Sequence, residues 1–170
     1  MAKVHSIWIA LLVGPLTGGA ALAKGIPSTP EVLGMIHHAN QREILMGKMA
    51  QEHGMSKDIM SFGKVLVKDH LAADKKVAKL AKDEGIDLAA NTPPADTHTD
   101  QIHTGTAFDD AFAEDMLEDH KKAVAAVTAA RDSTTDLKLK QLLTNILPVL
   151  KKHEDTAQKL VDQKLARSSR

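Results

Sequence analysis

Residues 56–85 read SKDIMSFGKVLVKDHLAADKKVAKLAKDEG, and this stretch decides the fold class. Its apolar side chains recur at the three- and four-residue spacing of one helix face, and the lysines around residues 75–82 indicate a solvated face opposite. His70 falls inside the apolar stripe, so the pattern predicts a polar ring that points into a core. The other members of the stripe are Ile59, Gly63, Leu66, Ala73 and Val77.

Three further segments show the same periodicity, and no segment shows the strict alternation of a strand. Ser28 or Thr29 can cap the first helix, and Asp109 is placed to close a capping box at the start of the third. Pro148 falls inside the fourth and is expected to kink that helix without ending it, because the apolar period resumes beyond it. The predicted helices cover residues 30–53, 57–84, 107–131 and 135–166.

The lengths of the connections predict the topology. Helices one and two, and helices three and four, are joined by a few residues each, which favours antiparallel neighbours. The middle connection holds about twenty residues rich in Pro, Thr, Asp and Ala, enough to travel the height of a helical bundle. We therefore expect an all-α fold, a ferritin-like four-helix bundle made of two antiparallel hairpins joined by a long crossover.

The first 23 residues have the features of a secretory signal peptide: a basic start, a short apolar run and a small-x-small ending at Ala23. The predicted domain is therefore residues 24–170, and we expect it to be exported; in a Gram-negative host, export would place it in the periplasm or in association with the envelope. No later segment carries the roughly 20 apolar residues that a membrane span needs. Peripheral association with the envelope and homo-oligomerisation are both left open by the sequence.

Composition limits the chemistry. The 22 basic and 22 acidic residues balance, and aromatic residues are scarce, so nucleic acid is not an expected partner. The chain has no cysteine, so packing has to stabilise the fold, and a metal site has to use histidine, carboxylate or methionine.

Each predicted helix places one strongly polar residue on its apolar face, and these residues form the candidate site: Glu43, His70, His120 and His153. Counted from the turns, Glu43 and His70 fall within roughly 5 Å of one level, whereas His120 and His153 differ by roughly 10 Å if the helix is ideal. Asp69 and Asp119 lie about 100° round their helices from the histidines, so we expect outer partners or surface residues there.

Two arrangements would satisfy these buried groups. One is a hydrogen-bonded network of glutamate, histidine and buried water. The other is a divalent metal such as zinc, iron, nickel or copper, held by three neutral imidazoles and one carboxylate. A weaker candidate for soft copper ligands is the trio Met46, Met49 and His53, although such methionines more often fill a core.

Four stretches resemble domain-of-unknown-function family 4142: HHANQREILMGKMA (37–50), FGKVLVKDH (62–70), FDDAFAEDMLEDH (108–120) and LPVLKKHEDTAQ (147–158). This exported bacterial family is placed with the ferritin-like bundles and often labelled an outer-membrane protein. The resemblance runs from about residue 30 to 165 and implies the four-helix fold but no activity. Di-iron bundles place a glutamate three residues before the histidine, and that position holds Val67, Leu117 or Leu150 here, so iron oxidation is not implied.

The sequence thus supports a metal-binding or metal-buffering envelope protein. The alternative is a non-catalytic envelope stress or interaction module in which a His-Glu network only specifies packing. A metal-dependent oxidoreductase is a third and less favoured interpretation.

Overall fold

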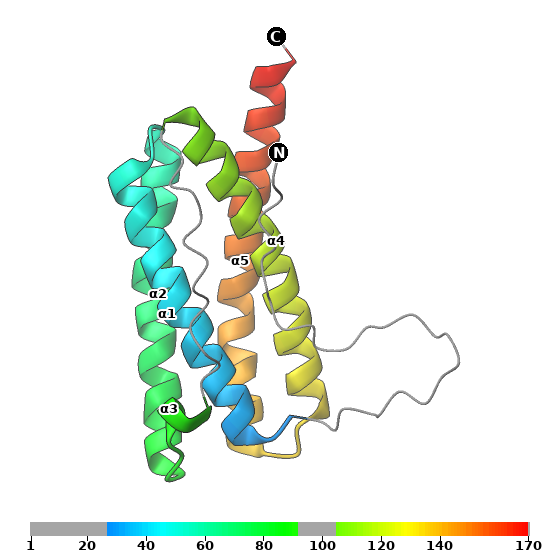
Figure 1. The fold of residues 1–170 in the computed structure, drawn as a ribbon. Helices are drawn as coiled ribbons and strands as arrows, with labels where there is room; N and C mark the ends of the chain where they lie inside the picture. The colour runs from blue at the N-terminus through cyan, green and yellow to red at the C-terminus, as the bar shows by residue number, and fades with distance from the viewer. Residues whose placement is uncertain (1–26, 92–104, 170) are drawn as a thin grey trace, which may run out of the picture.

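Helices account for nearly all of the described residues, 27–91 and 105–169, in the computed structural model of the chain (Figure 1). No strand occurs in these two ranges, so the predicted all-α class is confirmed. Four helices are long and one is a single turn within the expected connection. They are α1 (Thr29–His53), α2 (Lys57–Asp83), α3 (Leu88–Asn91), α4 (Thr106–Ser133) and α5 (Leu137–Ser168).

Three of the helix starts follow from local capping. The Ser28 N–H donates to the Glu31 carboxylate at 2.7 Å, which closes a capping box at α1. Ser56 accepts from the Ile59 N–H at the start of α2, and Asp136 accepts from the N–H groups of Lys138 and Leu139 at the start of α5.

The prediction for Asp109 was wrong. Gly105 is the N-cap of α4, and no side chain caps it. The Asp109 carboxylate instead accepts from the Met55 N–H at 2.9 Å and the Ser56 N–H at 2.8 Å. A tertiary contact to the turn between α1 and α2 has therefore replaced the local one. Pro148 lies within α5, which continues through it as expected.

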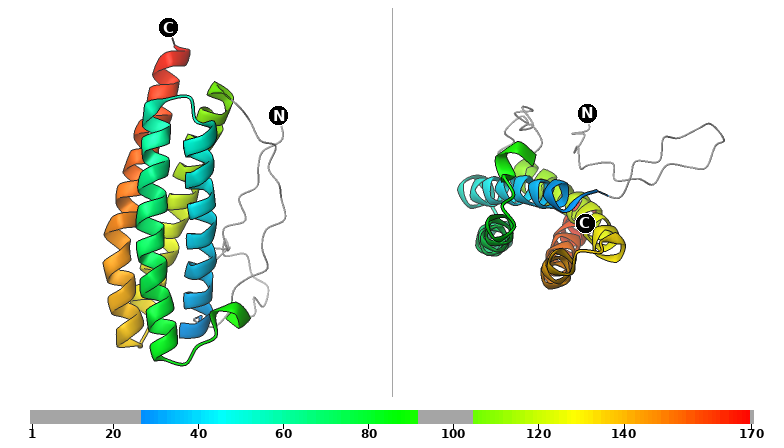
Figure 2. Two further views of the ribbon diagram at one scale, coloured as in Figure 1. Left: turned by 90° about the vertical axis from the view of Figure 1, so that its left-hand side faces the viewer. Right: turned by 90° about the horizontal axis from the view of Figure 1, so that it is seen from below.

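The long helices pack as two antiparallel pairs, α1 with α2 and α4 with α5 (Figures 1 and 2). The pairs are joined through contacts of α2 with α5 and of α1 with α4. Helices α2 and α4 run in the same direction (Figure 1), and residues 92–104 of the expected crossover lie outside the described residues. Short α3 packs on α1, where Gly34 allows a close approach: a Cβ there would overlap the Asn91 carbonyl oxygen.

Two hydrophobic clusters form the core, one toward each end of the long helices. The upper cluster contains Phe62, Phe112, Met116 and Leu160, and the lower cluster contains Leu33, Val77, Val127 and Leu143. On every long helix a buried polar residue lies between the two clusters in sequence; Asp109, near the start of α4, is buried apart from these. The buried polar residues between the clusters form one layer, which we call the polar layer: Asn40, Glu43, His70, Asp119, His120 and His153.

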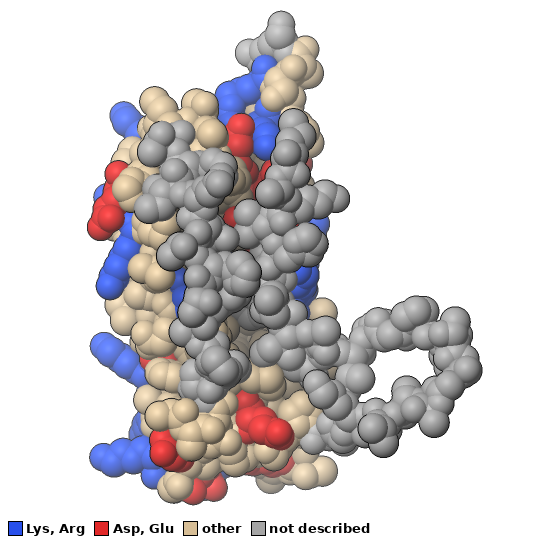
Figure 3. Space-filling view, viewed as in Figure 1, with Lys and Arg blue, Asp and Glu red and all other residues tan. Residues whose placement is uncertain are grey.

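The outer surface matches the balanced composition. Basic and acidic side chains are interspersed on the visible described face (Figure 3). Across residues 27–91 and 105–169, no helix combines the length and apolar character required to cross a bilayer.

Candidate metal centre

All four predicted site residues are buried in the polar layer. Their exposed fractions are 1% for Glu43, 5% for His70, 1% for His120 and 1% for His153. The apolar stripes therefore predicted the direction of each side chain correctly. One residue comes from each long helix, so the layer is built by all four helices together.

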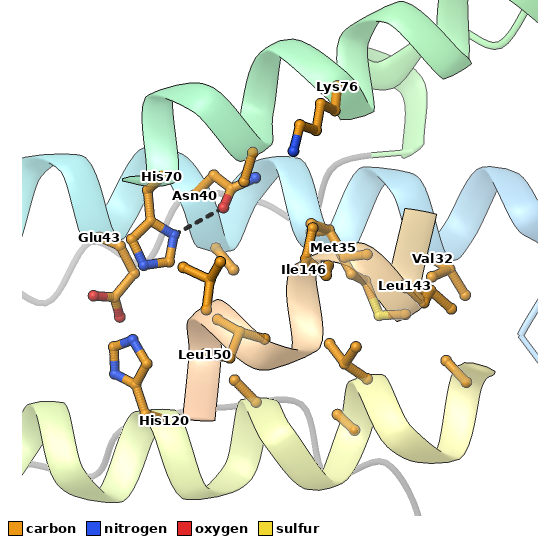
Figure 4. A pocket seen from close by; sticks show the side chains of 18 of the residues that line it. Val32, Met35, Asn40, Glu43, His70, Lys76, His120, Leu143, Ile146 and Leu150 are labelled. Atoms are coloured by element: carbon orange, nitrogen blue, oxygen red, sulfur yellow. Dashed lines mark hydrogen bonds between the residues drawn. The ribbon is translucent and has the colours of Figure 1, made fainter. Parts of the chain in front are cut away.

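The three histidines converge on one point. One ring nitrogen from each of His70, His120 and His153 lies within 4.8 Å of the other two. The ring centroids of His153 are 5.2 Å from those of both other histidines, and His70 and His120 are 5.9 Å apart. Glu43 is not a member of this group, although its carboxylate is directed toward His70 and His120 (Figure 4).

The expected 10 Å offset between His120 and His153 does not occur. His120 lies 13 residues before the end of α4, and His153 lies 16 residues after the start of α5. Helix α4 extends to Ser133 and α5 starts only at Leu137, so the difference shrinks to three residues, or about 4.5 Å along a helix. The remaining offset is small enough for packing and tilt of the two helices to absorb.

Hydrogen bonds fix the protons on two of the rings. The Met116 carbonyl oxygen lies 2.9 Å from His120 Nδ1 and can only accept, so Nδ1 carries the proton and Nε2 has a lone pair. The amide oxygen of Asn40 lies 2.9 Å from His70 Nδ1 and sets the same tautomer. His70 Nε2 is buried without a hydrogen-bond partner among the described residues.

The third ring completes an unusual arrangement. His153 Nε2 lies 3.1 Å from Asp69 Oδ2, and an ionised carboxylate only accepts, so the His153 proton belongs on Nε2. His153 Nδ1 then presents a lone pair to His120 Nε2 at 3.3 Å, which is also unprotonated. Two facing lone pairs repel unless a proton or a metal cation lies between them.

The surroundings disfavour the proton. Burial lowers the pKa of His70 to about 2, with the neighbouring His153 and His120 adding to the effect. Burial likewise lowers the pKa of His120 to about 4 and lowers the pKa of His153 against the opposing influence of Asp69. All three rings are therefore neutral near pH 7, which is the state that ligates metals.

The acidic part of the layer is separate from the histidine group. Burial, with Asp119 as the second cause, raises the pKa of Glu43 to about 8, while Arg42 opposes the rise. Asp119 has no exposed surface and accepts from the Arg42 guanidinium at 2.7 Å. Both Glu43 oxygens are buried without a hydrogen-bond partner in the described ranges.

The structure refines the predictions for the residues around the site. Asp69 is confirmed as an outer partner of a histidine, whereas Asp119 pairs with Arg42. Sequence reasoning missed Asn40, which orients His70. Its signal was present, because Asn40 lies three residues before Glu43 on the same helix face.

The candidate copper trio has packing roles in the structure. Met46 and Met49 pack against the upper hydrophobic cluster. The His53 ring lies 5.9 Å from that of Phe108. These contacts favour core filling over soft metal ligation for the three residues.

Comparison with known proteins adds a family. The model of a family described as "Domain of unknown function (DUF4142)" matches residues 15–160, in agreement with the resemblance found in the sequence. No curated protein matches the chain. No solved structure matches it either.

Proposed function

The chain belongs to the DUF4142 family, whose description gives no function, and we propose that it binds one divalent transition-metal ion through His70, His120 and His153. The observation that carries the proposal is the convergence of three buried imidazole nitrogens, two of which face each other at 3.3 Å with no proton assigned between them.

The donor set fits a metal ion. Zinc binds histidine nitrogen at about 2.0–2.1 Å in tetrahedral sites, which places two such nitrogens roughly 3.3 Å apart. The separation of His153 Nδ1 and His120 Nε2 is 3.3 Å. The third ring, His70, presents an unpartnered nitrogen within 4.8 Å of the other two ligand atoms. Imidazole ligands suit zinc, iron, copper and nickel, so the three rings do not select among these metals.

The hydrogen bonds around the rings support ligation. Each histidine has its other nitrogen held by a protein oxygen, from Asn40, from the Met116 carbonyl or from Asp69. Such outer partners fix the tautomer and the ring orientation in metal sites. Three histidines leave a further ligand position, where a bound metal would act as a Lewis acid toward water or another donor. Glu43 is a candidate for that position or for holding the water.

The cellular role follows from the predicted leader. Residues 1–23 lie outside the described residues, and the proposal that they export the chain rests on their sequence. Together with the metal site, it describes a metal-binding or metal-buffering protein of the periplasm or envelope. The two antiparallel pairs and the shared direction of α2 and α4 support a ferritin-like four-helix bundle as the underlying topology.

A second function keeps the histidines structural. Every ring already has one protein hydrogen bond, and Asp69 and Asn40 could serve only to fix the packing of the polar layer. In that case the chain would be an interaction module without metal.

Metal content separates the two functions. The chain is purified untagged from the periplasm, and its metals are measured by mass spectrometry. We expect one ion per chain, lost in His120→Ala and His153→Ala and kept in His38→Ala, which removes a histidine of α1 that lies outside the group. A saturating metal should also stabilise the fold, by about 2.7 kcal/mol at one hundred times its Kd. Protein that stays metal-free after exposure to zinc, iron and copper would leave only the structural role.

A further inference from the structure

A cavity of about 310 Å³ is lined by residues of α1, α2, α4 and α5, and it extends from the histidine group toward the lower hydrophobic cluster. We call it the chamber. Its polar wall is formed by Asn40, Glu43, His70 and His120, and these residues gather at one end (Figure 4). Its other end is apolar and includes Val32, Met35, Leu143 and Ile146. Ligand pockets in proteins have this composition and begin at about 300 Å³.

Unpartnered polar atoms point to a ligand at the polar end. Asn40 Nδ2 and both carboxylate oxygens of Glu43 are buried and have no hydrogen-bond partner in the described part of the chain. The two residues are 4% and 1% exposed, and they lie three positions apart on one face of α1. Leaving a buried polar group unsatisfied destabilises the fold, so these atoms need a partner that occupies the chamber.

Water alone fits the chamber poorly. A buried water needs two to four polar partners, and the unpartnered buried atoms that line the chamber belong to Asn40, Glu43 and His70 at its polar end. The apolar end offers no such partners along Val32, Leu143 and Ile146. A molecule with an apolar body in that end and one polar group at the polar end would match both ends of the chamber.

We propose that the chamber binds a small, mostly hydrocarbon molecule with a single hydroxyl group. The hydroxyl lies between Asn40 and Glu43, and the hydrocarbon lies among Val32, Leu143 and Ile146. A hydroxyl suits the two residues because it can accept from the Asn40 Nδ2–H and donate to a Glu43 oxygen at the same time. A cavity of about 150 Å³ holds benzene, so this chamber has room for about a dozen non-hydrogen atoms.

A neutral head group fits better than a carboxylate. A carboxylate at the polar end would have no buried cation beside it among the described lining residues, because Lys76 is exposed and Lys122 pairs with Glu118 at the surface. Burying a charge without a partner is much more costly than burying a hydroxyl. Glu43 is also a candidate for the further ligand position of the proposed metal, so the inference is tested on the metal-free chain.

The test is a calorimetric titration of the full-length chain, treated with EDTA, with n-decanol. We expect saturable binding of one molecule per chain. Methyl nonyl ether, which is matched in size but lacks the O–H donor, should bind about tenfold more weakly because one of the two polar groups stays unpaired. Decanoate should also bind more weakly than the alcohol. Equal affinity for alcohol and ether, or tighter binding of decanoate, would overturn the hydroxyl assignment.

Two variants locate the binding. Ala126 lines the chamber, whereas its neighbour Ala125 is exposed and does not. We expect Ala126→Leu to weaken n-decanol binding at least tenfold and Ala125→Leu to change it less than twofold. In the unmodified chain, methyl NMR signals of Ile36 and Ile146 should shift on adding the alcohol, and those of Ile44 should not, since Ile44 does not line the chamber. Unchanged binding in Ala126→Leu, no saturable binding, or shifts that spare Ile36 and Ile146 would overturn the proposal.

Discussion

His153 Nε2 lies 3.1 Å from Asp69 Oδ2, across the contact between α5 and α2. Because the carboxylate accepts this hydrogen bond, it directs the His153 lone pair at Nδ1 toward His120. Outer partners of this kind typically contribute 10- to 100-fold to metal affinity. We therefore expect Asp69→Ala to weaken zinc binding about 10- to 100-fold, measured by competition with a chelator of known affinity.

The chain contains a matched control for this change. Asp74 accepts from His37 Nδ1 at 2.7 Å in a second His-Asp pair that lies outside the histidine group. Asp74→Ala should leave zinc affinity within about twofold of the original chain, because no proposed ligand is oriented by it. If Asp69→Ala and Asp74→Ala bind zinc equally well, Asp69 does not position a ligand.

The buried glutamate gives the metal-free protein a pH dependence. The folded-state pKa of Glu43 is raised to about 8 from an ordinary value of 4.5, so the folded chain holds this proton where the unfolded chain has released it. Stability associated with protonated Glu43 is complete below pH 4.5 and is lost as pH rises through about 8. Glu43→Gln has no proton to lose. Its free energy of unfolding relative to the original chain should therefore rise with pH over this window. The rise is a few kcal/mol at most, because one pKa unit corresponds to about 1.4 kcal/mol.

Urea unfolding in EDTA at pH values from 5 to 9 measures this difference. Other groups also titrate over the range, but they are common to both proteins and cancel in the comparison. Glu52→Gln makes the same change on the exposed face of α1 and controls for removal of a carboxylate. A difference between Glu43→Gln and the original chain that stays constant with pH would contradict the prediction.

The direction of the site residues could be predicted from sequence because helical periodicity is local. The apolar neighbours of His70, His120 and His153 are enough to place each ring on an inward face. The sequence could not decide whether Glu43 joins the histidines, because that depends on how the four helices are rotated about their axes and shifted along them relative to one another. Helix α4 ends and α5 begins two residues later than predicted, and this alone changed the expected height of His153 relative to His120 by several ångströms.

Glycine roles were also undecided at the sequence level. Small residues beside the polar positions could either leave room for a site or let helices approach closely. Gly47 and Gly63 do the second: a Cβ on Gly63 would lie 2.6 Å from the Gly47 carbonyl oxygen, and one on Gly47 would lie 2.7 Å from the Gly63 carbonyl oxygen. Only the structure, in which α1 packs against α2, shows that these two glycines face each other.

This close contact predicts a stability defect. Gly63→Ala should destabilise the fold by about 1–3 kcal/mol, because the added methyl meets backbone that cannot move like a flexible side chain. The change would otherwise gain up to about 1 kcal/mol from helix propensity. Ser61→Ala, on the exposed face of the same helix, is the control and should be neutral or slightly stabilising. Denaturant unfolding that shows Gly63→Ala to be as stable as the original chain would contradict the close α1–α2 contact.

Asp109 provides the last prediction, since it joins two parts of the chain that are more than fifty residues apart. The residue is 7% exposed, and its carboxylate accepts from the N–H groups of Met55 and Ser56 in the turn before α2. Asp109→Ala leaves both N–H groups without this acceptor, so we expect a loss of about 1–3 kcal/mol in unfolding free energy. The neighbouring Asp110 pairs with Arg167 at the surface, where such pairs contribute about 1 kcal/mol or less. Asp110→Ala should therefore cost less. Hydrogen exchange adds a local readout: the amides of Met55 and Ser56 should exchange faster in Asp109→Ala and not in Asp110→Ala, and equal protection in the two variants would show that Asp109 does not hold this turn.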